Sequence, residues 1–155
     1  MNHKIIWIPL LALVTVATAQ GQTFSTWAPW ESDSVATAWV LKRHVYPDAT
    51  FQALPKGTPI EDLSLDVPSS PYRRTATATA FEAAIQQHHI QTPCVARLTP
   101  LLRLLELAPW RKSTNPEAEA FEAQLVPLLP VEPTVGGLEQ VFALLDTFCQ
   151  EETTP

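Results

Sequence analysis

The chain has 155 residues, a formal net charge of −6, four glycines and fifteen prolines. This length allows one compact domain, and the many prolines favour short elements with firm ends over a flexible repeat. An acidic chain is a poor candidate for nucleic-acid binding, because phosphate contacts need a basic face.

The first residues have the pattern of an export signal. Lys4 supplies a basic start, residues 5–16 form an apolar run, and Ala17-Thr18-Ala19 offers the small residues that a signal peptidase reads. We expect residues 1–19 to be a cleaved signal peptide and residues 20–155 to be an exported domain, periplasmic or extracellular.

An uncleaved membrane anchor is the alternative for this segment. The apolar run is shorter than the roughly 20 residues that span a bilayer, and it contains a proline. No stable membrane insertion is therefore expected after the signal is removed.

Short strands are predicted in the first half of the mature chain. Residues 23–27 are rich in threonine and aromatic side chains, and residues 49–54 alternate as a strand does. Residues 63–67 offer a third strand, after a turn-rich link at residues 56–59.

A helix is predicted between the first two of these strands. Ser32 or Asp33 can accept the free amide hydrogens at its start, and Pro47 ends it. Lys42 and Arg43 fall in its last turns, where the helix dipole favours positive charge.

The second half of the chain is predicted to be helical. Four helices are expected, over residues 79–89, 93–105, 116–126 and 138–149. Thr92 and Asn115 each precede a proline, which is a helix-start signal. Pro100 should kink the helix that contains it, or Thr99-Pro100 should begin a separate helix.

Strands gathered early and helices gathered late predict an α+β fold. In this fold a small β-sheet packs against a layer of four to five α-helices in a single domain. A purely helical bundle with disordered early segments is the alternative.

The only two cysteines are Cys94 and Cys149. They fall near the start of one predicted helix and near the end of another, so they can form a disulfide if those helices pack side by side in an oxidising compartment. The alternative is two small buried thiols.

Several motifs resemble the chromate-resistance exported protein family. Residues 33–43 carry an acidic residue, a small-residue helix with Ala-Trp and two basic residues, and Pro-Asp-Ala-Thr-Phe follows at residues 47–51. The agreement continues at residues 65–68 and at Phe81-Glu82, and covers about Trp27 to Val126. The resemblance implies a role in chromate resistance, either as an exported accessory or as the sensor part of an efflux regulator. The signal peptide favours the exported role.

The chain also departs from the family pattern. Ser34 stands where the family has a basic residue, Arg74 where it has histidine, and Thr79-Ala80 where it has Cys-Thr; Arg103 to Glu106 replaces a His-Asp-Ala-Asp-like stretch. With no thiol at that position and no glycine-rich dinucleotide loop, a reductase is not expected. Accordingly no catalytic residue, metal ligand or cofactor is predicted.

The candidate ligand-binding residues combine family matches with a basic stretch before a helix. They are Asp33, Lys42, Arg43, Arg73, Arg74, Thr79 and Glu82. Guanidinium groups, hydroxyls and free helix amides suit a tetrahedral anion such as chromate.

We therefore expect a non-enzymatic exported protein associated with chromate resistance that binds a small oxyanion. One alternative is a structural or interaction protein that kept the fold but lost the ligand or metal site. Another is a metal-dependent enzyme using Glu82, Glu106 and a histidine. A purely structural explanation also covers the candidates, as helix caps and a basic surface loop.

Overall fold

The computed structural model describes residues 21–61 and 63–150, in which strands and helices alternate early and helices dominate later. The strands are β1 (Thr23–Trp27), β2 (Thr50–Leu54) and β3 (Thr134–Val135). The α-helices are α1 (Ser32–His44), α2 (Ala80–Gln87), α3 (Pro93–Glu106), α4 (Pro116–Leu125) and α5 (Glu139–Gln150), with short 3₁₀ helices η1 (Pro109–Thr114) and η2 (Val126–Leu128) on either side of α4. The predicted signal peptide, residues 1–19, lies outside the described residues.

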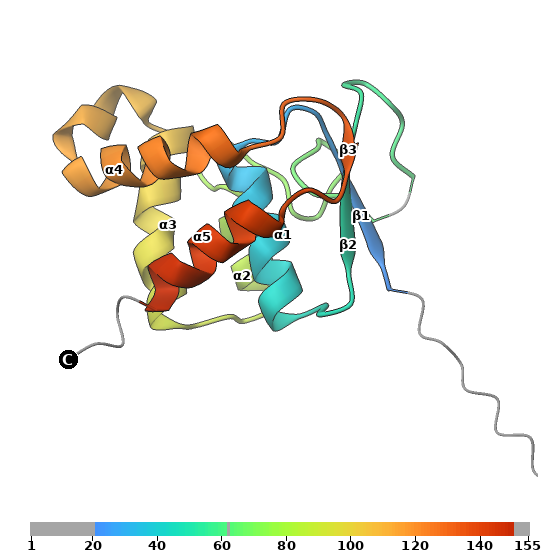
Figure 1. The fold of residues 1–155 in the computed structure, drawn as a ribbon, viewed down its shortest axis with the longest axis horizontal. Helices are drawn as coiled ribbons and strands as arrows, with labels where there is room; N and C mark the ends of the chain where they lie inside the picture. Colours follow the sequence, from blue (N-terminus) through green and yellow to red (C-terminus); the bar gives the residue numbers. More distant parts are fainter. Residues whose placement is uncertain (1–20, 62, 151–155) are drawn as a thin grey trace, which may run out of the picture.

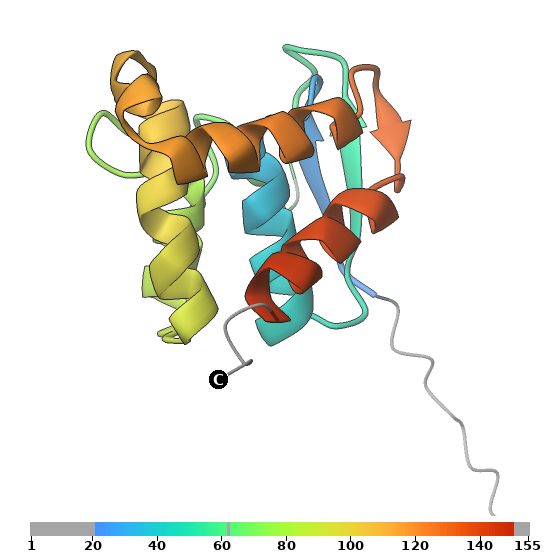
Figure 2. The ribbon, with the colours of Figure 1, turned by 60° about the vertical axis from the view of Figure 1, so that its left-hand side comes forward.

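The three strands form one small sheet in the order β1-β2-β3. β1 runs parallel to β2 with Phe24 opposite Phe51, and β3 pairs with β2 in the antiparallel direction with Val135 opposite Gln52. The sheet lies at one end of the molecule, and α1 lies between it and α3 (Figures 1 and 2). This arrangement confirms the predicted α+β fold.

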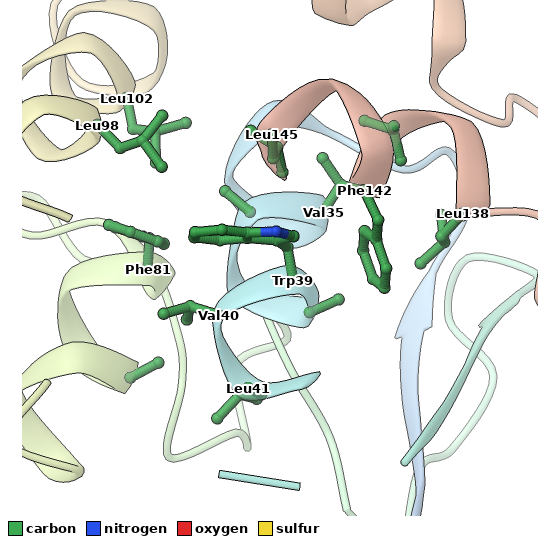
Figure 3. Packing of buried hydrophobic residues seen from close by; sticks show 14 of the residues in the cluster. Val35, Trp39, Val40, Leu41, Phe81, Leu98, Leu102, Leu138, Phe142 and Leu145 are labelled. Carbon is green, nitrogen blue, oxygen red and sulfur yellow. The ribbon is translucent and has the colours of Figure 1, made fainter. Parts of the chain in front are cut away.

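Helix α1 is the centre of the hydrophobic core. Every residue from Ser32 to Leu41 is buried, so the helix is covered on all sides rather than along one stripe. Figure 3 shows Trp39 with Phe81 of α2 on one side and Phe142 and Leu145 of α5 on the other. The sheet, α2, α3 and α5 are therefore all positioned against the same helix.

The predictions for strands were confirmed in two places and wrong in one. β1 and β2 form where expected, but residues 63–67 form only isolated bridges, Ser25 with Ser64 and Leu65 with Tyr72. The cause is Asp66, whose φ of 50° is a left-handed conformation that interrupts an extended strand. Aspartate is one of the few residues that adopt this conformation readily.

Helix α3 continues through Pro100 as one helix, so no separate helix begins at Thr99. An interior proline costs about 3 kcal/mol, because it removes one backbone hydrogen bond and crowds the preceding turn. Leu98 and Leu102 are fully buried in the same helix, and each contributes about 1.5–3 kcal/mol through burial. Core packing therefore offsets the cost of the proline.

A disulfide joins Cys94 in the first turn of α3 to Cys149 in the last turn of α5, with a Cα–Cα distance of 5.0 Å. The two helices meet at this end of the molecule. The bond fixes the C-terminal end of α5, whose other end packs beside the sheet.

Candidate functional site

Four carboxylates surround the guanidinium of Arg74, which lies in the loop before α2. Its Nη2 lies 2.5 Å from Glu31 Oε2 and 2.9 Å from Asp66 Oδ2, its Nη1 lies 2.7 Å from Glu106 Oε2, and its Nε lies 3.3 Å from Asp33 Oδ2. These five residues, the Arg74 cluster, connect the start of α1, the loop after β2, the loop before α2 and the end of α3. One positive charge faces four carboxylates.

Asp33 caps α2 rather than its own helix. Its side chain is fully buried and accepts hydrogen bonds from the backbone N–H of Ala80 at 2.6 Å and of Phe81 at 2.8 Å. The expectation that Ser32 or Asp33 caps α1 was wrong, because Glu31 occupies the capping position of that helix. The first free amides of α2 are thus taken by a carboxylate of the chain itself.

Burial shapes the protonation of the cluster. It raises the pKa of Asp33 from 3.8 to about 6, against the opposing effect of the two α2 amides and of Arg74. Burial, followed by the charge of Asp33, raises the pKa of Asp66 to about 6, and burial also raises the pKa of Glu106. The carboxylates depend on the guanidinium to stay ionised at neutral pH.

Thr79 and Glu82 complete the start of α2. Thr79 Oγ1 accepts a hydrogen bond from the Glu82 amide at 3.1 Å, and Glu82 Oε2 accepts one from the Thr79 amide at 2.9 Å, which makes a capping box. Glu82 also pairs with Arg103 at 2.7 Å. Both candidate residues therefore have structural partners.

The Arg74 cluster does not present the donors that a tetrahedral anion needs. Arg74 is neutralised by carboxylates, the α2 amides bind Asp33, and Thr79 is fully buried. Arg73 is exposed and makes no ion pair with any described residue. An anion would meet net negative charge here.

Lys42 and Arg43 lie apart from the Arg74 cluster, at the opposite end of α1, and line a pocket of about 380 Å³. Its volume is within the roughly 300–1,000 Å³ range of small-molecule sites. The pocket, here the Lys42 pocket, is lined by Lys42, Arg43, Ala49, Thr50, Phe51, Val135, Gly136, Leu138, Glu139 and Phe142.

The two cations of this pocket differ in their partners. Arg43 makes a bidentate pair with Asp146 at 2.9 and 2.6 Å, and Trp39 Nε1 donates to the same carboxylate at 2.8 Å. The hydrogen bond from Arg43 lowers the pKa of Asp146. Lys42 instead donates to the carbonyl oxygen of Ala49 at 2.7 Å and has no carboxylate partner among the described residues.

The residues of the metal-enzyme alternative each have another partner. Glu82 pairs with Arg103, Glu106 pairs with Arg74, and His88 Nε2 contacts the hydroxyl of Tyr72 at 2.7 Å. Within residues 21–61 and 63–150, no group of three or more His, Cys, Asp or Glu side chains is arranged to hold a metal ion. None of the helices in this part of the chain has the length and apolar character to cross a membrane.

Sequence reasoning missed Glu31, Asp66 and Asp146 as partners of the candidate arginines, and named Glu106 only in another role. Asp66 stood within a family-like motif, which gave a signal for its importance. Glu31 and Asp146 gave none, since their partners Arg74 and Arg43 lie 43 and 103 residues away in sequence.

In a comparison with known protein families, the model of the ChrB C-terminal domain matches residues 24–151. No curated protein and no solved structure is detectably similar to the chain. The matched region contains every described α-helix, β2, β3 and all of β1 except Thr23, together with both arginine sites and both cysteines. The chain therefore belongs to the ChrB C-terminal domain family, which associates it with chromate resistance.

Proposed function

We propose that the protein is a non-enzymatic, exported accessory of chromate resistance that binds a small anion such as chromate in the Lys42 pocket. The observation that carries this proposal is Lys42, a half-buried residue that lines the pocket and lacks a carboxylate partner among the described residues. A partly desolvated cation without a counterion gains free energy when an anion binds beside it.

Two further features of the pocket support an anion. Arg43 lines it beside Lys42, and only two of its nitrogens donate to Asp146, so Nη1 makes no hydrogen bond with the described residues. Leu138, which precedes α5, and Glu139, the first residue of α5, also line the pocket, and the N-terminus of a helix carries partial positive charge. The negative charge of Glu139, which also lines the pocket, acts against anion binding.

The absence of catalysis is proposed because the polar groups have structural partners. The carboxylates of the Arg74 cluster bind a guanidinium, Glu82 caps α2, and His88 contacts Tyr72. Holding an anion requires none of these residues to exchange a proton.

Calorimetry tests the anion proposal directly. We expect chromate and sulfate to bind to the wild-type protein, and Lys42→Met to weaken that binding at least tenfold because it removes the uncompensated charge and keeps the length of the side chain. Arg73→Met removes an exposed cation outside the pocket and is the matched control. Unchanged affinity in Lys42→Met, or a loss of affinity in Arg73→Met of the same size, contradicts the proposal.

Export is proposed from the predicted signal peptide, and a disulfide is the kind of bond that persists outside the cytosol. The intact mass of the protein recovered from the periplasm provides the test. We expect a chain that begins at Gln20, and a chain that keeps residues 1–19 contradicts signal cleavage.

A second candidate function is a structural or interaction protein that kept the fold without a ligand site. The self-neutralised Arg74 cluster favours it, because the candidate residues there act as cross-links between segments. Growth of a deletion strain on chromate separates the two candidates. Equal rescue by the wild type and by Lys42→Met supports the interaction protein, whereas rescue by the wild type alone supports anion binding.

A further inference from the structure

The Lys42 pocket has an apolar wall as well as a cationic end. Phe51 of β2, Leu138 at the start of α5 and Phe142 of α5 line it, and the rings of Phe51 and Phe142 are 6.0 Å apart in an edge-to-face arrangement. Figure 3 shows Leu138 and Phe142 on the side of α5 that faces the strands. An inorganic oxyanion has no surface that gains from contact with this wall.

Val135 of the edge strand β3 also lines the pocket. It is 81% exposed, which makes it the most exposed large hydrophobic residue in the described part of the chain. It stands on β3 opposite Gln52 of β2, so its side chain lies on the face of the sheet that carries Gln52 and not on the face that carries Phe51. The apolar wall is therefore formed by Phe51, Leu138 and Phe142.

The charged groups fix where the anionic part of such a ligand would lie. Lys42 and Arg43 belong to the last turn of α1, and the Cζ atom of Arg43 lies 5.7 Å from the centre of the Phe142 ring. The cationic end and the aromatic wall are therefore adjacent. Glu139 lines the pocket from the first turn of α5 and is exposed.

We infer that the Lys42 pocket binds an amphipathic organic anion, a carboxylate on an aromatic or aliphatic body, in preference to a bare oxyanion. The carboxylate pairs with Lys42, and the body covers Phe51, Leu138 and Phe142. This inference rests on the proposed anion binding at the same pocket and specifies the class of ligand. A volume of about 380 Å³ accommodates such a molecule.

The apolar contact should dominate selectivity. Removing roughly 60 Å² of apolar ligand surface from water is enough for a tenfold gain in affinity. The charge contact should decide between an acid and its neutral amide, because the amide leaves Lys42 without a counterion. The two contacts can therefore be measured separately.

Calorimetry of the mature chain with sulfate, phenylacetate, hexanoate and phenylacetamide tests the inference. We expect at least one of the two organic acids to bind tenfold or more tightly than sulfate, and phenylacetamide to bind at least tenfold more weakly than phenylacetate. Lys42→Met should lower the affinity for the preferred acid at least tenfold, and Glu139→Gln should raise it about threefold, because an exposed negative charge beside the pocket is removed. The opposite signs of these two variants guard against a loss that reflects misfolding.

The outcomes separate this inference from the proposed function. If sulfate binds as tightly as both organic acids, the ligand class is wrong and anion binding stands. Equal affinity for phenylacetate and phenylacetamide overturns the role of Lys42. If none of the anions binds, both proposals fail.

Discussion

Arg74→Met lowers the free energy of unfolding by about 3 kcal/mol at pH 7. The loss arises because the Arg74 cluster keeps its four carboxylates but loses the one cation that pairs with them. Asp33 is fully buried and the side chain of Asp66 is 9% exposed, so neither can recover the interaction from water. Denaturant unfolding measures the loss. Arg73→Met is the matched control, because Arg73 is the sequence neighbour of Arg74 but is exposed and makes no ion pair with the described residues. The free energy of unfolding of Arg73→Met should stay within about 0.5 kcal/mol of the wild-type value.

The deficit of Arg74→Met should depend on pH in a defined direction. In the wild-type protein the pKa values of Asp33 and Asp66 are raised to about 6, so between about pH 4 and pH 6 the folded chain binds more protons than the unfolded chain. These two groups therefore make stability fall as the pH rises through that window. Removal of Arg74 raises both pKa values further, because its charge lowers them.

The difference between Arg74→Met and Arg73→Met should consequently be small at pH 5 and largest at pH 7 and above. At pH 5 the buried carboxyl groups of the variant are protonated and need no cation. A deficit of equal size at pH 5 and pH 7 contradicts the proposed ionic role. Such a result would indicate that Arg74 stabilises the fold through packing alone.

Reduction of the Cys94–Cys149 disulfide lowers stability by about 4 kcal/mol, and the melting temperature by about 10–15 °C. The bond closes a loop with a sequence separation of 55, and loops of this length lose considerable entropy when the unfolded chain is cross-linked. Thermal unfolding with and without dithiothreitol measures the shift. The reductant should leave the melting temperature of the double variant Cys94→Ala/Cys149→Ala unchanged. The prediction is contradicted if mass spectrometry shows that the wild-type disulfide is reduced and the melting temperature stays the same.

The local elements of the fold were predictable because their signals are local. Thr92-Pro93 and Asn115-Pro116 begin α3 and α4 as expected, and the side chains of Thr92 and Asn115 each accept a backbone amide hydrogen bond. The apolar spacing of residues 138–149 predicted α5. Residues 63–67 were mispredicted because the left-handed backbone of Asp66 leaves no mark on the alternation of side chains.

The site was less predictable because it depends on contacts between distant segments. Arg74 and Asp33 were named as candidates, but nothing in their neighbourhood indicates that Glu31, Asp66 and Glu106 converge on the same guanidinium. Lys42, Arg43 and Arg74 were candidates for one ligand site, whereas the 13-residue length of α1 places Lys42 and Arg43 at the end of that helix away from Arg74. Helix length was available from sequence, but the packing of α5 and β3 that forms the pocket was not.

The central claim is that an anion binds in the Lys42 pocket and not at the Arg74 cluster. The most direct test is a chromate titration of the ¹⁵N-labelled protein, followed by its backbone amide chemical shifts. We expect saturable shifts for pocket residues such as Thr50, Val135 and Gly136, and no saturable shift at Ala80 and Phe81, whose amides bind Asp33. Saturable shifts at Ala80 and Phe81 with an unchanged pocket would contradict the account.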